Sequence, residues 1–257
     1  MSEVDTPKPQ ENPMTNILVN VLVPVIALSA LSKDPSLADA KPWHLGPVWA
    51  LILALALPLG YGIWFLIKHR KPNFFSILGL ISVLLTGGLT LYLWKKDGTV
   101  DSSAPLLFGL KEASIPFILG ITIFVSHWSK SPLLNTFLYN DQIFDIKRIA
   151  SEVEKRSLQA PYRKLLFQCT LIFAGSFLLA VVLNFFVAQF FLSPEKIDYN
   201  AENARELYNV AVGKITFWGY IIIGLPSMGI LFYCMMHLLK GLRKLTDLKN
   251  EEIMLPR

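Results

Sequence analysis

Six long runs without a charged residue constrain this chain more than any other feature of its sequence. They cover residues 13–32, 45–67, 73–94, 113–129, 165–194 and 215–239, which is more than half of the 257 residues. A helix needs about 20 apolar residues to cross the hydrocarbon core of a bilayer. Charged residues make up only 17% of the chain, against about 25% in soluble proteins. We therefore predict an all-α, polytopic membrane protein with about six transmembrane helices.

The distribution of Lys and Arg predicts the orientation of these helices. With six spans, the N-tail, the second and fourth connections and the C-tail lie on one side, and they carry 16 of the 24 basic residues. Basic residues are enriched on the cytoplasmic side of membrane proteins, so both termini are expected to be cytoplasmic. The net charge of +5 is thus assigned to orientation and to contact with anionic lipids at the cytoplasmic face, and not to nucleic-acid binding.

The domain organisation follows from the runs and this orientation. Residues 1–12 are predicted to form a cytoplasmic N-tail, residues 13–239 a transmembrane domain and residues 240–257 a basic cytoplasmic C-tail. The helices are expected at about 13–32, 45–67, 73–94, 109–129, 165–192 and 215–239. The first run lacks the positive flank of a secretory signal and is expected to be retained. The six tryptophans all lie near run ends, which is typical of residues at the headgroup level.

Two connections are predicted to contain helices of their own. In the cytoplasmic connector 130–164, apolar residues recur at helical spacing: Ile143, Ile146, Ile149, Ala150 and Val153. Such an amphipathic helix is expected to lie in the membrane interface, and a partner-binding helix is the alternative. In the outer connector, residues 201–212 also have a helical pattern. The short connection 68–72 predicts that the second and third spans are antiparallel neighbours.

Signatures of enzymes are missing from the sequence. It has no HExxH, GxSxG, GxxxxGK or CxxC motif, and its four histidines are scattered without metal-ligand spacing. The two cysteines, Cys169 and Cys234, fall in the cytoplasmic halves of their spans, where reduced thiols are expected. We predict a non-enzymatic protein without a cofactor or a bound metal.

Polar and small residues inside the apolar runs are the candidate functional residues. Ala56 and Gly60 have the spacing that lets two helices pack closely. On the predicted orientation, a further set gathers in the outer half of the membrane: Thr86, Gly87, Gly88, Lys111, Glu112, Asn184 and Lys214. Charges inside a membrane are costly and often functional, so this set predicts a small polar site, with structural packing as the alternative. Lys111 and Glu112 are adjacent and point about 100° apart on a helix. We therefore expect Glu112 to pair with another base, such as Lys214.

Several of these residues belong to stretches that resemble a known family. The stretch LTGGLTLYL at 85–93, Lys111 with the span after it, KSPLL at 130–134, LNFFVA at 183–188 and KITFWG at 214–219 are similar to the intracellular septation protein A family of bacterial inner-membrane proteins. The resemblance covers spans two to six and implies a distant member, because both long connectors and the acidic N-tail differ.

The resemblance implies a multi-pass protein of the bacterial inner membrane that serves cell-envelope integrity or cell division through lipids or through envelope and division proteins. The alternative function is a transporter or permeation path for a small molecule or an ion. Gly87, Gly88, Pro58, Pro116 and Pro226 supply the helix breaks that transporters use. The sequence leaves the ligand and the oligomeric state open.

Overall fold

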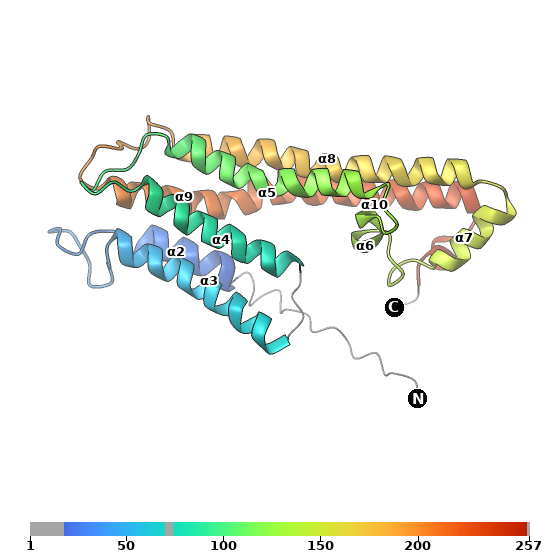
Figure 1. The fold of residues 1–257 in the computed structure, drawn as a ribbon, viewed down its shortest axis with the longest axis horizontal. Coiled ribbons are helices and arrows are strands. Elements are labelled where there is room, and N and C mark those ends of the chain that lie inside the picture. Colours follow the sequence, from blue (N-terminus) through green and yellow to red (C-terminus); the bar gives the residue numbers. More distant parts are fainter. Residues whose placement is uncertain (1–17, 70–73, 256–257) are drawn as a thin grey trace. The chain divides into compact units, whose positions relative to one another are not determined.

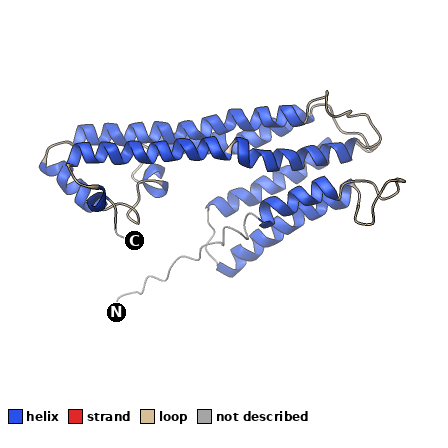
Figure 2. Ribbon diagram, turned by 180° about the vertical axis from the view of Figure 1, so that it is seen from behind, coloured by secondary structure: helices blue, strands red, loops and turns tan. Residues whose placement is uncertain are grey.

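The computed structural model describes residues 18–69 and 74–255, and within these ranges it contains helices and two isolated β-bridges but no strand (Figures 1 and 2). The all-α prediction is confirmed. In chain order the elements are the π-helix η1 (Leu18–Leu22), α2 (Val23–Ala30), α3 (Pro47–His69), α4 (Phe74–Leu93), α5 (Ala104–Ser126), α6 (Leu133–Phe137), α7 (Ile146–Lys155), α8 (Gln159–Phe191), α9 (Ala204–Ile222), α10 (Gly224–Thr246) and α11 (Asn250–Ile253).

The chain forms two compact units that share helices. The first unit comprises Met1–Glu112 and Asn184–Ile221, and the second comprises Ala113–Leu183 and Ile222–Arg257. Helices α5 and α8 each begin in one unit and end in the other. The sequence predicted one transmembrane domain, and the division into two units was not expected from it.

In the first unit, α2 packs on α3 and α3 packs on α4, as the short connection between the second and third spans predicted. Its core also includes buried residues of α5, α8 and α9, among them Phe108, Ala188 and Tyr208. Gly213 of α9 lies directly against α2, where an added Cβ would be 2.5 Å from the Ser29 hydroxyl. The absence of a side chain at this position allows α9 to approach α2.

In the second unit, α8 and α10 contact each other at two levels. The Cys234 thiol donates a hydrogen bond to the carbonyl of Cys169 at 3.4 Å, and both cysteines are buried free thiols. Further along, Gly241 of α10 lies against the side chain of Leu165. Helix α5 joins them through Gly120, where an added Cβ would be 3.2 Å from the Cβ of Phe177.

The amphipathic helix predicted in the connector 130–164 is present as α7, and the short α6 precedes it. The Asp145 side chain caps α7 by accepting a hydrogen bond from the backbone N–H of Arg148 at 3.0 Å. The sequence led us to expect that the apolar face of α7 would lie in the membrane interface. In the structure this face is not free to do so. Ile149 and Val153 are buried in the core of the second unit, because α7 packs against α10 and α11.

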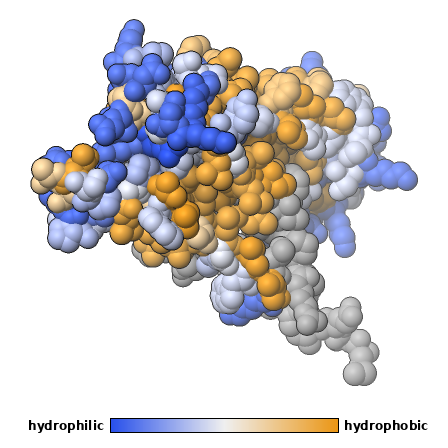
Figure 3. Space-filling model, turned by 60° about the vertical axis from the view of Figure 1, so that its left-hand side comes forward, coloured by the Kyte–Doolittle hydropathy of each residue, from blue (hydrophilic) through white to orange (hydrophobic). Residues whose placement is uncertain are grey.

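Among the described residues, four helical segments are long and apolar enough to cross a membrane: Pro47–Trp64, Ala104–Ser126, Gln159–Phe191 and Ala204–Thr246. A shorter apolar helix covers Leu78–Leu93. Many large apolar side chains on these helices are exposed, as the orange areas of Figure 3 show, which suits helices that face lipid. A helical membrane protein is thus supported, while the number of six spans and the side of each terminus stay predictions.

Several predicted boundaries differ from the observed helices. The helix expected at 201–212 is not separate, because α9 runs on to Ile222 without a break and α10 follows at once. Gly213 does not interrupt it because that residue is buried against α2. Helices α5 and α8 start earlier than expected, at Ala104 and Gln159, since charged residues near a helix end do not stop a helix. Part of the first predicted span lies outside the described residues.

Candidate functional site

The Nζ of Lys111 is the centre of a polar cluster in the first unit. It donates hydrogen bonds to the hydroxyl of Thr86 at 2.6 Å and to a carboxylate oxygen of Glu112 at 2.7 Å. It also lies 5.3 Å from the centre of the Phe108 ring, whose negative face attracts a cation. Its side chain is only 8% exposed. Two oxygens and one aromatic ring therefore surround a charge that little solvent reaches.

Thr86 connects this cluster to the neighbouring helix. Its hydroxyl donates a hydrogen bond to the carbonyl of Ser82, one turn earlier in α4, at 2.9 Å. A hydroxyl has one proton and two lone pairs, so the same oxygen can also accept from Lys111. Helix α4 thus supplies an oriented acceptor to a cation on α5. Away from bulk water such a hydrogen-bonded ion pair is stable only when its polar atoms have partners.

The expectation that Lys111 and Glu112 could not pair with each other is wrong. Although their Cα–Cβ bonds diverge, the long Lys111 side chain folds back far enough for its Nζ to reach the carboxylate. The alternative base, Lys214, is exposed on α9 and, among the described residues, makes no ion pair with Glu112. The acid is 26% exposed, so the pair lies with its cation inside and its carboxylate nearer the surface.

The two glycines of α4 have different surroundings. Gly87 is buried against α3, where an added Cβ would be 2.6 Å from a methyl of Leu55. Gly88 is exposed, and an added Cβ would have open space. Of these two glycines, only Gly87 therefore mediates a close approach between helices.

The other predicted residues lie in different surroundings. Asn184 is half-buried on α8, within the first unit. Ala56 and Gly60 lie on an exposed part of α3, and an added Cβ at Gly60 would meet no atom within 4 Å. A packing role for Ala56 and Gly60 stays a prediction.

A buried polar group next to the cluster was missed in the sequence. The Tyr208 hydroxyl lies 3.4 Å from the Thr90 hydroxyl, and its ring packs edge-to-face on Phe108 at 6.3 Å. The next residue, Asn209, is fully buried and donates to the Ser32 hydroxyl at 3.1 Å and to the Pro47 carbonyl at 2.9 Å. Both residues fall in a connector of mixed charge, where a search restricted to apolar runs does not look. The amide of Asn209 fixes the ends of the loop between α2 and α3 against α9.

Metal ligands and known relatives give no further assignment. Within residues 18–69 and 74–255, no group of three or more His, Cys, Asp or Glu side chains is arranged to hold a metal ion. No family model, curated protein or solved structure matches the chain. The fold and the cluster themselves define the class of protein, which is a helical membrane protein with an internal Lys–Glu pair.

Proposed function

We propose that this chain is a multi-pass protein of the bacterial inner membrane that serves cell-envelope integrity or division. In this proposal it acts through contacts with lipids and protein partners and catalyses no reaction. The observation that carries the proposal is the pairing of Lys111 with Thr86 and Glu112. The resemblance of the stretches around 85–93 and Lys111 to septation protein A supports the same assignment.

The pairing favours a conformational role over a role in substrate binding. The cation of Lys111 already has two oxygen partners from its own chain and is nearly inaccessible. A charge in such a place is expensive unless it is paired or used. Because Thr86 belongs to α4 and Lys111 to α5, the cluster holds two helices in one arrangement that a partner in the membrane can recognise.

A transporter is the second candidate, and one observation favours it. The carboxylate of Glu112 is partly exposed while it contacts Lys111. Paired acids and bases within membrane-spanning segments form the proton relays of some transporters, and the Lys111–Glu112 pair has the same composition.

The double variant Lys111→Met/Glu112→Gln tests the proposal. It removes both charges, so no unpaired ion remains buried, and we expect normal insertion and abundance. In a strain that lacks the native gene, we expect this variant to leave the envelope or division defect uncorrected. The matched control is Lys96→Met, which removes an exposed base from the loop after α4 and should restore normal cells. Full complementation by the double variant would refute a functional role for the cluster.

Transport is measured separately with the purified chain in sealed vesicles. A pH gradient that the wild type collapses and Glu112→Gln preserves would favour the transporter and contradict the proposed function. No difference between vesicles with and without the protein supports the envelope assignment.

A further inference from the structure

A basic groove lies at the end of α10, well separated in sequence from the Lys111 cluster. Its volume is about 380 Å³, and it is lined by Lys240, Arg243, Lys244, Asp247, Leu248 and Lys249. Four of these six residues are cations and one is an acid. The surplus of positive charge makes the groove suitable for an anion.

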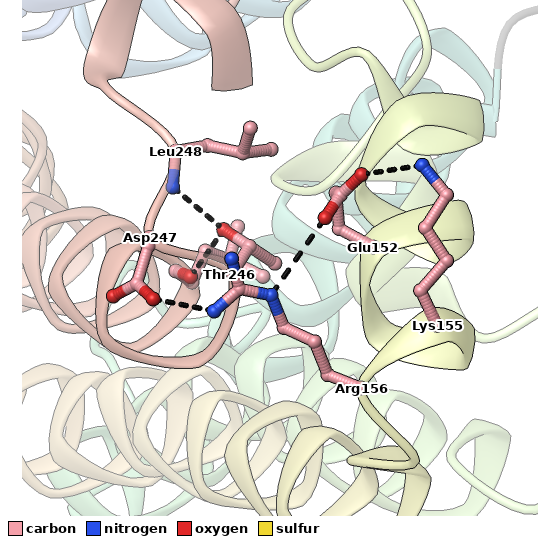
Figure 4. Close-up of polar contacts among 7 residues, drawn as sticks. Glu152, Lys155, Arg156, Thr246, Asp247 and Leu248 are labelled. Atoms are coloured by element: carbon pink, nitrogen blue, oxygen red, sulfur yellow. Dashed lines mark hydrogen bonds and ion pairs between the residues drawn. The ribbon is translucent and has the colours of Figure 1, made fainter.

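The single acid of the groove is already neutralised from outside it. Arg156, which follows α7, forms an ion pair with Asp247 and also contacts Glu152 at 3.7 Å (Figure 4). Among the ion pairs of the described residues, none involves any of the four groove cations. Their charges are therefore available to a ligand.

Hydrogen bonds fix the turn after α10, which supplies Asp247 and Leu248 to the lining of the groove. The Thr246 hydroxyl donates to the carbonyl of Leu242 at 2.8 Å and accepts from the backbone N–H of Leu248 at 3.3 Å (Figure 4). The Asp247 N–H donates to the carbonyl of Arg243 at 2.9 Å, and Asp247 has a φ of 56°. This turn is ordered by the chain itself, so a ligand need not order it on binding.

The position of the groove along α10 indicates which anion it meets. The uncharged run 215–239 ends directly before Lys240, and on α8 the run that starts at Leu165 follows Arg163 and Lys164. Leu165 contacts Gly241. The boundary between the basic and the apolar part of α8 therefore lies beside the same boundary of α10. In a bilayer such a boundary lies in the headgroup region, where phosphate groups lie.

We infer that this groove binds the phosphate of an anionic phospholipid headgroup. Lys and Arg donate charge-assisted hydrogen bonds to phosphate oxygens, and several cations around one diester give a preference for anionic over zwitterionic lipid. The inference rests on the membrane placement in the proposed function and adds to it a specific site and ligand class.

The test uses the full chain in an uncharged detergent, with phosphatidylglycerol or phosphatidylcholine added and bound lipid counted by native mass spectrometry. We expect the wild type to prefer phosphatidylglycerol. In Lys240→Gln/Lys244→Gln this preference should fall by about fivefold for each base removed, the factor that corresponds to about 1 kcal/mol per base near a membrane surface. The control Lys130→Gln/Lys147→Gln removes two exposed bases of the same unit outside the groove and should keep the preference.

Three results would overturn the inference. The first is an unchanged preference in the groove variant, and the second is an equal loss in the control. The third is displacement of phosphatidylglycerol by excess inorganic phosphate at constant ionic strength, which would assign the groove to free phosphate. Cell complementation is scored independently of these measurements. A chain that binds phosphatidylglycerol in the groove but corrects no envelope defect would refute the proposed function alone.

Discussion

At the scale of single residues, Lys111 keeps its charge in α5 because two oxygens of the chain lie within 2.7 Å of its Nζ. The sequence indicates that the charge of this residue is energetically unfavourable, since Lys111 and Glu112 lie directly before an apolar run. It does not show the partner on α4, because Thr86 is 25 positions away and only the packing of two helices brings it close. The candidate residues could thus be predicted better than their contacts.

The two adjacent glycines of α4 give a prediction at the same scale. Gly87→Leu should lower the free energy of unfolding by about 1–3 kcal/mol, as overpacking commonly does, because its side chain must displace Leu55. Gly88→Leu should be close to neutral, since its surroundings are open. Thermal unfolding in detergent measures both, and equal effects of the two substitutions would contradict the packing of Gly87 on α3.

At the scale of elements, the spacing of apolar residues predicted α7 but not what covers it. A single sequence shows that one face of a helix is apolar. That pattern is the same whether the face is covered by the membrane, by a partner protein or by the core of the chain itself. The structure covers the face with α10 and α11. The continuation of the helix predicted at 201–212 through Lys214 into α9 could not be predicted either, because the charges near Lys214 interrupt the hydropathy without breaking the backbone.

The burial of α7 predicts the effect of truncating its apolar face. Ile149 is fully buried, so Ile149→Ala should destabilise the protein by about 2–5 kcal/mol. Ser151→Ala, on the exposed side of the same helix, should have little effect. The two variants are compared by denaturant unfolding in detergent. Wild-type stability of Ile149→Ala would restore the expectation that this face lies on the membrane.

The surface of α7 also predicts a dependence on pH. A hydrogen bond from Lys155, followed by the charges of Lys155 and Arg156, holds the pKa of Glu152 below its usual value of 4.5. The folded state therefore gains stability from this acid above pH 4.5 and loses it as the pH falls through the lowered pKa. The protection factors of the α7 amides, which are exchange rates corrected for the intrinsic rate at each pH, should fall below pH 4.5. The fall should be smaller in Glu152→Gln, and an identical pH profile in that variant would contradict the assignment.

At the scale of the whole molecule, composition and hydropathy were sufficient to predict an all-α membrane protein. The long uncharged runs leave few other folds, because backbone groups in lipid must be satisfied within a helix. The two compact units could not be predicted, since α5 and α8 pass from one to the other without a break in either helix.

The orientation of the molecule is tested with introduced cysteines, because Cys169 and Cys234 are buried. In intact cells, Ser36→Cys and Glu202→Cys should react with an impermeant thiol reagent added outside, whereas Ser151→Cys should react only after permeabilisation. All three positions are exposed. Labelling of Ser151→Cys in intact cells would reverse the orientation derived from the Lys and Arg distribution.

The length of α8 has a mechanical consequence. Its uncharged part runs from Leu165 to Phe191, and at 1.5 Å per residue this part is about 40 Å long. The hydrocarbon of an ordinary bilayer is only about 30 Å thick. Such hydrophobic mismatch is relieved by helix tilt or by local thickening of the membrane. Bilayer thickness is thereby coupled to the angle of a helix that contributes to both units.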